Sequence, residues 1–236
     1  RHGYEPFLLV GGATGQIGDP KENGERELKS LDEVEHNKKC IAEQMRRVIK
    51  SDDLTMVDNY DWFREMKYLD FLREVGKAFS MTQLLDRQFV QNRIGEGGSG
   101  ISYAEFSYTL IQGYDFLHLY RKYGIDLQLC GADQFGNCSS GIPLIKRLEG
   151  GTADVWSTPL IIDPATGRKF GKSERNAIWL DSKKTSIFDF YQFWINQPDE
   201  AVEYLLKIYT LLDKEAVKGL MTEQKEHPER RAAQRA

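Results

Sequence analysis

Three polar side chains recur at helical spacing within a mostly apolar stretch: Tyr108, Gln112 and Asp115. Residues 105–123 have the pattern of a helix, and Gly124 follows as its C-terminal stop. Positions i, i+4 and i+7 share one helix face, so the three side chains line one stripe. Such a stripe is also typical of an exposed helix surface. Because apolar residues flank it here, we expect burial, and a buried carboxylate needs a partner. Asp115 is therefore predicted to face a ligand.

The neighbouring elements are predicted to aim further polar groups at the same place. Residues 125–130 have the length and composition of a strand, and 131–137 (GADQFGN) form a glycine-bounded loop after it. Ligands of open α/β sheets bind at the carboxyl ends of such strands. Residues 6–10 read as a buried strand that leads into GGATGQIGDP, whose four glycines permit close backbone approach, although a tight turn explains them equally well.

The remaining pattern predicts an α/β fold with a doubly wound parallel sheet. Helices are expected over residues 31–49, 68–79, 83–93, 139–148, 188–196 and 200–212, and strands over 55–57 and 157–162. At 236 residues the chain can form one α/β domain and a smaller appended piece. The boundaries are placed at 1–157, 158–196 and 197–236.

Composition excludes several function classes. The net charge of -4 gives no general support for nucleic-acid binding, although a local basic patch stays open. The chain has three cysteines and no CxxC pair, which argues for reduced thiols and against a zinc site. No apolar run has the length of a membrane span, and no signal peptide is visible.

Residues 167–173 (GRKFGKS) come close to a phosphate-binding P-loop but have three residues between the glycines, where that motif has four. A P-loop NTPase would hydrolyse ATP without a second substrate. An ordinary basic loop is the other alternative that the residues leave open.

Taken in order, YTLIQGYDF, LQLCGADQFGN, KFGKSE and IWLDSKKTS resemble the bacterial and mitochondrial tyrosyl-tRNA synthetases, a class I aminoacyl-tRNA synthetase family. The resemblance runs from about Pro6 to the end of the chain. It implies a Rossmann-like catalytic domain without its first strand unit, followed by a small α-helical segment. The tryptophanyl enzymes are the nearest sibling, but their second signature is normally KMSKS, so KFGKS favours tyrosine.

The resemblance implies an ATP-dependent ligase that makes tyrosyl-adenylate and pyrophosphate from L-tyrosine and Mg²⁺-bound ATP, then transfers tyrosyl to tRNA(Tyr). The implied catalytic cations are Lys169, Lys172, Arg26 and, less securely because its loop is one residue short, Lys21. The implied tyrosine-binding residues are Asp19, Asn59, Tyr108, Gln112, Asp115 and Gln134. The implied ATP-binding residues are Gly131, Asp133, Leu160, Ile161, Lys169 and Lys172. Surface charge explains Lys21 and Arg26 as well, and turn formation explains Asn59.

One departure concerns the start of the chain. The HIGH-type motif of class I enzymes is absent, which predicts either an incomplete record of a synthetase or a non-catalytic tyrosine- or RNA-binding paralogue. The first interpretation is favoured because KFGKS is intact. The resemblance also implies a homodimer, with Tyr103 and Phe106 at its interface unless they pack within one chain. It implies a cytoplasmic or mitochondrial location and an anticodon-binding domain beyond the sequence.

Overall fold

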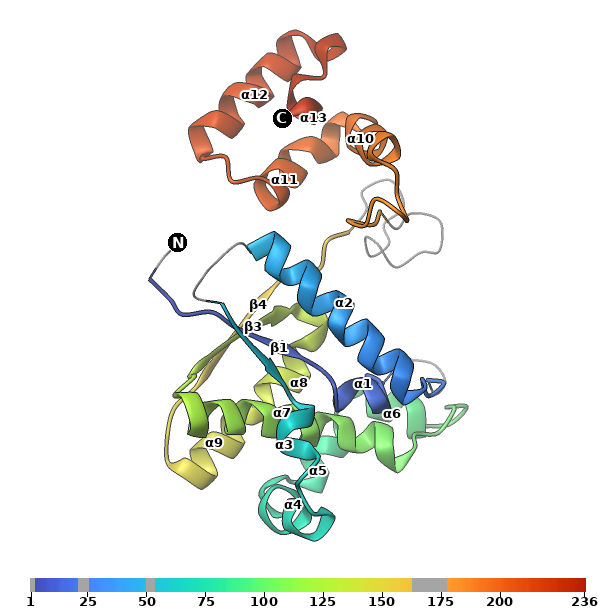
Figure 1. The fold of residues 1–236 in the computed structure, drawn as a ribbon, viewed down its shortest axis with the longest axis vertical. Helices are drawn as coiled ribbons and strands as arrows, with labels where there is room; N and C mark the ends of the chain where they lie inside the picture. Colours follow the sequence, from blue (N-terminus) through green and yellow to red (C-terminus); the bar gives the residue numbers. More distant parts are fainter. Residues whose placement is uncertain (1–2, 21–25, 50–53, 163–177) are drawn as a thin grey trace. The chain divides into compact units, whose positions relative to one another are not determined.

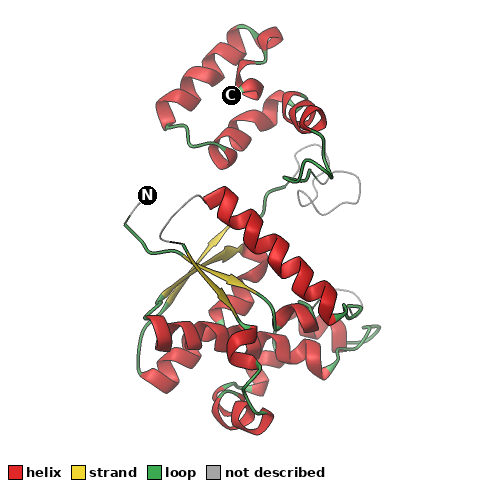
Figure 2. Cartoon of the chain, viewed as in Figure 1, coloured by secondary structure: helices red, strands yellow, loops and turns green. Residues whose placement is uncertain are grey.

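The computed structural model describes residues 3–20, 26–49, 54–162 and 178–236. The chain forms two compact units, Arg1–Thr158 and Pro159–Ala236. Each unit is described by itself (Figures 1 and 2).

The first unit alternates strands and helices. Its strands are β1 (Phe7–Val10), β2 (Thr55–Asp58), β3 (Leu127–Gly131) and β4 (Asp154–Thr158). Its helices are α1 (Thr14–Ile17), α2 (Leu31–Ile49), α3 (Tyr60–Phe63), α4 (Tyr68–Glu74), α5 (Met81–Leu85), α6 (Gln88–Ile94), α7 (Tyr103–Tyr123), α8 (Phe135–Ser139) and α9 (Gly141–Glu149). Two 3₁₀ turns, Gly76–Ala78 and Ala132–Gln134, complete this unit.

The four described strands of this unit pair in parallel. β1 pairs with β2 so that Val10 faces Asp58, and β3 pairs with β4 so that Cys130 faces Ser157. Helix α2 packs on β1, whereas α8 contacts β3 and β4 and packs with α7 and α9. In Figure 1, α2 runs beside the strands and α7 and α9 lie below them. The unit is a Rossmann-like α/β fold, with helices on more than one side of parallel strands.

Helix α7 forms the centre of the core, as its apolar composition predicts. Phe116 and Leu117 are fully buried, and they cluster with Val75, Leu144 and Ile145 from neighbouring elements. The Ser102 hydroxyl accepts a hydrogen bond from the Glu105 backbone N–H and begins the helix. Gly124 ends it with φ 68°, the left-handed conformation that glycine adopts most easily.

Several expected elements are confirmed, and others differ for local reasons. Helix α2 has the expected bounds of 31–49. The single helix expected over 83–93 is wrong, because Arg87 is extended between α5 and α6. The helix expected over 139–148 divides at Ser140, where Pro143 in the next turn lacks the N–H that would continue it.

The expected strand over 157–162 is also wrong in its bounds, since β4 ends at Thr158. Pro159 follows directly and cannot donate to the strand ladder. The helix expected over 68–79 ends at Glu74 and continues as the 3₁₀ turn that begins at Gly76.

In the second unit, the described elements are helices, which begin at Ile187. It contains α10 (Ile187–Ile195), α11 (Asp199–Tyr209), α12 (Lys214–Glu226), the 3₁₀ turn Pro228–Arg230 and α13 (Ala232–Arg235). Val202, Leu206, Val217 and Ala233 form its core. The Asp199 carboxylate accepts hydrogen bonds from Gln224 at 3.0 Å and Gln234 at 2.6 Å, which tie α11 to α12 and α13.

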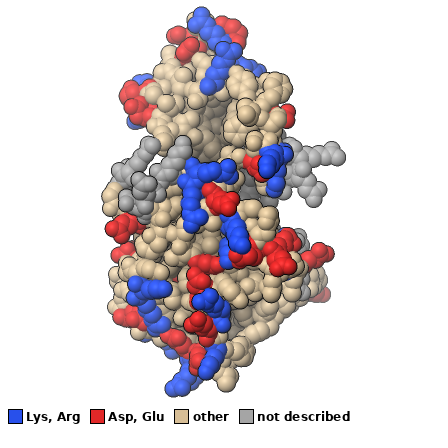
Figure 3. Space-filling view, in the orientation of Figure 1, with Lys and Arg blue, Asp and Glu red and all other residues tan. Residues whose placement is uncertain are grey.

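The surface carries both signs of charge intermixed, as the face drawn in Figure 3 shows. On α2, Glu35 pairs with Lys38 at 2.5 Å and with Lys39 at 3.4 Å. Among the described residues, no helix is both long enough and apolar enough to span a bilayer.

Candidate active site

The Asp115 carboxylate lies at the centre of the candidate site and is 1% exposed. Its Oδ1 accepts a hydrogen bond from Trp62 Nε1 at 2.9 Å, and its Oδ2 accepts one from Asn59 Nδ2 at 3.1 Å. Both donors come from the segment that follows β2, so α7 supplies the acceptor, and Asn59 and the Trp62 side chain of α3 supply the donors. The predicted burial of Asp115 is confirmed, and its carboxylate has two hydrogen-bond donors from the protein itself.

Burial raises the pKa of Asp115 to about 7, and the hydrogen bonds from Asn59 and Trp62 lower it only in part. Both donors are neutral, so they orient the carboxylate without cancelling its charge. The indole of Trp62 is in turn stacked on His118, with ring centroids 4.4 Å apart and planes 17° from parallel. The carboxylate is thus held in place and remains open to protonation near neutral pH.

Asn59 is fully buried and joins three elements. Its Oδ1 accepts from the Ala13 backbone N–H at 2.7 Å, and its Nδ2 also donates to Thr14 Oγ1 at 3.1 Å. It stands at the N-cap position of α3 but makes no side-chain cap there. The turn-forming interpretation is therefore insufficient, because the side chain fixes the glycine-rich segment and Asp115 together.

A second polar cluster forms around Asp19, which ends the GGATGQIGDP segment. Its Oδ2 accepts from Gln134 Nε2 at 2.9 Å, and its Oδ1 accepts from Asn137 Nδ2 at 3.1 Å. Arg26 Nε donates to the Asp19 backbone carbonyl. The segment after β3 and the segment after β1 therefore meet beyond the carboxyl ends of their strands, where ligands of α/β folds bind.

A cleft of about 770 Å³ opens beside this cluster. Its lining includes the Asp19 carboxylate, the Arg26 side chain and Tyr108. The remaining lining residues are Gly11, Thr14, Gly15, Gln16, Ile17, Gly18, Glu27, Leu28, Lys29 and Glu33. Burial, followed by the nearby Asp19 charge, raises the pKa of Tyr108, so its hydroxyl stays protonated and can donate.

Gln112 lies between Tyr108 and Asp115 on the α7 stripe. Its Oε1 is buried and has no hydrogen-bond partner among the residues that the structure describes. Such an atom loses free energy unless a ligand or water supplies a donor. The stripe predicted from spacing thus presents a hydroxyl, an unsatisfied acceptor and a carboxylate along one helix.

Close backbone packing supports the glycine-rich segment. The Gly12 backbone N–H donates to Asp58 Oδ1 at 3.0 Å, and a Cβ at Gly12 would lie 2.3 Å from that oxygen. Asp58 also pairs with Lys38 at 2.7 Å. At this glycine, close approach is the reason for the residue type.

The other predicted site residues differ in how far they can be placed. Gly131 ends β3, and Asp133 is exposed in the turn that follows. Leu160 and Ile161 belong to the second unit. Lys21, Lys169 and Lys172 lie outside the described residues. Among the described residues, no group of three or more His, Cys, Asp or Glu side chains could hold a metal ion.

Sequence reasoning did not identify Trp62, Thr14 or Asn137 as site residues. Trp62 lies three positions after Asn59 in NYDW, and that short spacing was the available signal. Asn137 lies three positions after Gln134 and belongs to α8, where the sequence pattern predicted a loop over 131–137. Thr14 gave no comparable signal, since its contact with Asn59 joins residues 45 positions apart.

Comparison with known proteins places these features in a family. Residues 1–236 match the family described as tRNA synthetases class I (W and Y). Tyrosine–tRNA ligase 1 of Enterococcus faecalis is 45% identical over 237 residues, covering 99% of this chain and 56% of that protein. The tyrosine–tRNA ligase of Bacteroides fragilis is 44% identical over 242 residues, again covering 56% of the relative. The chain therefore spans a little over half the length of these relatives.

Solved structures agree on the fold. A C-terminally truncated mitochondrial tyrosyl-tRNA synthetase of Coccidioides posadasii superposes with a TM-score of 0.82 at 27% identity, covering 99% of this chain and 68% of that one. The tyrosyl-tRNA synthetase of Archaeoglobus fulgidus, at 16% identity and a TM-score of 0.56, shares the fold. With a family match over its whole length and a site built at the ends of parallel strands, the chain belongs to the class I tRNA synthetases of the W and Y type.

Proposed function

We propose that the full-length protein is a tyrosine–tRNA ligase that activates L-tyrosine with ATP and transfers it to tRNA(Tyr). The observation that carries the proposal is the buried Asp115 carboxylate, 1% exposed and held by two neutral donors. A carboxylate in that state is a strong acceptor for a neutral hydroxyl. The phenol of tyrosine supplies such a hydroxyl, whereas phenylalanine would leave the buried charge without it.

The amino group of the substrate is proposed to bind at the other polar cluster. Asp19 supplies a negative charge for an ammonium group, and Gln134 orients that carboxylate. Tyr108 lines the same cleft, and Gln112 offers an acceptor without a hydrogen-bond partner in the described part of the chain. On this proposal Asn59 acts through Asp115, because its amide donates to that carboxylate.

ATP is proposed to bind with Mg²⁺ as the substrate complex, with Asp133 at the ribose and the backbone of Gly131, Leu160 and Ile161 at the nucleotide. The tyrosine carboxylate attacks the α-phosphorus and expels pyrophosphate, so positioning and charge stabilisation carry the rate. The cations proposed to stabilise the leaving group are Arg26, Lys21, Lys169 and Lys172.

The proposal extends to the organisation of the whole protein. Residues 1–157 would form the catalytic domain, 158–196 a connecting segment with KFGKS, and 197–236 the start of a path to an anticodon-binding domain. A homodimer with Tyr103 and Phe106 at its interface, in the cytoplasm or the mitochondrial matrix, completes the proposal.

The test is tyrosine-dependent ATP–pyrophosphate exchange by the full-length gene product, with phenylalanine as the competing substrate. The kcat/KM for tyrosine divided by that for phenylalanine should fall in Asp115→Ala. A site built to bond a hydroxyl rejects the analogue that lacks it, and tyrosyl-tRNA synthetases are the established example of this rule.

Gly219→Ala is the matched control. This glycine lies on α12, and a Cβ there would meet nothing within 4 Å. Its ratio should equal that of the wild type. Exchange that does not depend on tyrosine, or an unchanged ratio in Asp115→Ala, would remove the proposed role of Asp115.

A further inference from the structure

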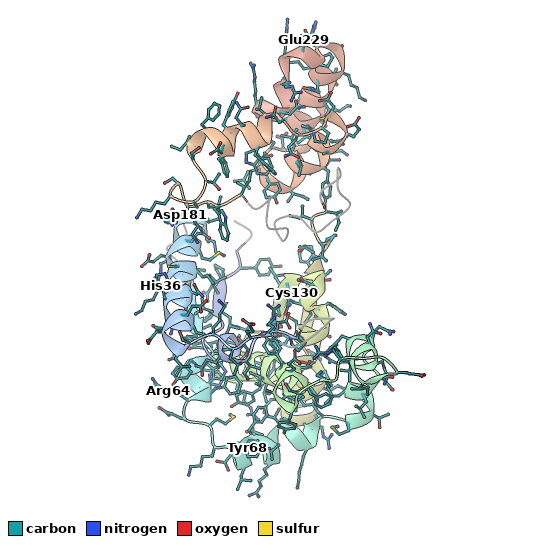
Figure 4. All side chains as sticks on the ribbon, turned by 90° about the vertical axis from the view of Figure 1, so that its right-hand side faces the viewer. His36, Arg64, Tyr68, Cys130, Asp181 and Glu229 are labelled. Atoms are coloured by element: carbon teal, nitrogen blue, oxygen red, sulfur yellow. The ribbon has the colours of Figure 1, made fainter. Side chains whose placement is uncertain are left out.

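A relay of hydrogen bonds leads from the Asp19 carboxylate into the protein. Asn137 Nδ2 donates to Asp19 Oδ1 at 3.1 Å, and Thr109 Oγ1 donates to Asn137 Oδ1 at 3.1 Å. Arg87 Nη1 in turn donates to Thr109 Oγ1 at 3.1 Å. The relay thus runs through α8 and α7 to the residue that precedes α6. Figure 4 labels Cys130 on β3, the strand that precedes this part of α8, and shows side chains of the first unit crowded below that label.

Arg87 sets the direction of the bonds in this relay. A guanidinium only donates hydrogen bonds, whereas a hydroxyl both donates and accepts. Because Arg87 donates to the Thr109 hydroxyl, the hydroxyl hydrogen points away from it, to Asn137 Oδ1. The Asn137 oxygen is then occupied, so its amide N–H groups face Asp19. The opposite orientation of this amide would place its oxygen against the carboxylate, and two acceptors repel each other.

The relay is enclosed at its centre and charged at its far end. Thr109 is 1% exposed, and Arg87 is half-buried. Burial lowers the pKa of the Arg87 guanidinium, and no carboxylate among the described residues forms an ion pair with it. A guanidinium stays protonated in proteins. Its bond to Thr109 is therefore charge-assisted and stronger than a bond between two neutral groups.

We propose that Arg87 and Thr109 are positioning residues, which orient the Asp19 carboxylate for the ammonium group of the substrate. Both act through Asn137. The cleft lining, as far as the structure describes it, includes Asp19 but neither of the two positioning residues. The inference rests on the proposed function, because that function supplies the ammonium group.

Loss of either positioning residue should release the Asn137 amide. Without Arg87, the Thr109 hydroxyl can donate to the helix carbonyl one turn earlier, a bond that threonine readily forms. The Asn137 oxygen then loses its donor and the amide can rotate, while the Asp19 carboxylate keeps the bond from Gln134 at 2.9 Å. A carboxylate with more rotational freedom binds an ammonium group more weakly, because binding must immobilise it.

The experiment compares two ligands of the full-length protein by calorimetry. One is L-tyrosine, and the other is its desamino analogue, in which a hydrogen replaces the ammonium group. Thr109→Val keeps the shape of the side chain and removes the hydroxyl. We expect it to raise the Kd of tyrosine about tenfold, which equals about 1.4 kcal/mol, and to leave the Kd of the analogue unchanged. Unchanged binding of the analogue separates lost positioning from a damaged fold.

Arg87→Met is the second variant, since it removes the donor and keeps a long apolar side chain. It should also weaken tyrosine binding, whereas the loss of a nearby cation would by charge alone strengthen the binding of an ammonium group. The double variant Arg87→Met and Thr109→Val should bind tyrosine as Thr109→Val does, because both residues act through one relay.

Two conservative changes serve as controls. Thr109→Ser keeps the hydroxyl and should bind tyrosine as the wild type does. Thr222→Val makes the matched change on α12, where the hydroxyl donates to the Lys218 carbonyl at 3.0 Å, and should leave the Kd of both ligands unchanged.

The outcomes separate the relay from the proposed function. An unchanged tyrosine Kd in Thr109→Val or in Arg87→Met, an equal loss for both ligands, or additive losses in the double variant would overturn the relay and leave the proposed function in place. If the wild type binds tyrosine no more tightly than the desamino analogue, the proposed ammonium site at Asp19 fails, and the inference fails with it.

Discussion

Replacing Asp115 with asparagine should flatten the pH dependence of folding stability. The carboxylate is 1% exposed and its pKa is raised to about 7, with burial as the main cause. Asparagine has nearly the same size and does not titrate. The comparison of Asp115→Asn with the wild type therefore isolates this one ionisation.

The sign follows from the two pKa values. In the unfolded chain the pKa of an aspartate is about 3.9. Between that value and about 7 the folded protein holds a proton that the unfolded chain has lost, so the free energy of unfolding falls as the pH rises. The full difference is about 4 kcal/mol, of which about 2.5 kcal/mol is lost between pH 5 and pH 8.

The assay is urea unfolding of the full-length protein at pH 5 and pH 8, followed by circular dichroism. The wild type should lose about 2.5 kcal/mol more than Asp115→Asn between the two pH values. Trp62→Phe removes a donor that lowers the Asp115 pKa, so its loss of stability should extend to higher pH. Equal losses in the wild type and Asp115→Asn would refute a folded-state pKa near 7.

Three further predictions concern a buried ion pair and two glycines. Arg93 and Glu105 form a buried ion pair at 2.8 Å, with side chains 2% and 3% exposed. Arg93→Met should therefore lower the free energy of unfolding, measured in urea, by about 3–5 kcal/mol, because it leaves the Glu105 charge buried without this partner. The double variant with Glu105→Met should recover most of that loss, and no recovery would contradict a penalty from the unpaired charge. Gly12→Ala should lower stability by about 1–3 kcal/mol, because its Cβ would lie 2.3 Å from Asp58 Oδ1. Gly219→Ala, with nothing within 4 Å of its Cβ, should instead raise stability by about 0.5–1 kcal/mol, and the opposite order of midpoints would show that the close contact does not govern Gly12.

The sequence predicted those helices whose faces and ends are marked by nearby residues. The α7 stripe follows from the spacing of Tyr108, Gln112 and Asp115, and the end of α7 follows from Gly124. The division of 83–93 was missed, because a helical pattern does not reveal one extended residue such as Arg87. Donors to a buried group were missed for a different reason: Trp62 lies 53 positions from Asp115, and only the fold brings them together.

The neutral partners of Asp115 bear both on its predicted cost in stability at neutral pH and on the substrate recognition that we propose for it. A cationic partner would lower the carboxylate pKa and pair with its charge, leaving little reason for a neutral hydroxyl to bind there. The amide of Asn59 and the indole of Trp62 fix the orientation of the oxygens and leave the charge for a further donor. A donor from the substrate would then add stabilisation in the bound state that the free protein lacks. On this reasoning, Asp115 lowers the free energy of unfolding and is also the residue that would select the substrate hydroxyl most strongly. Such a combination is expected where local stability and function conflict.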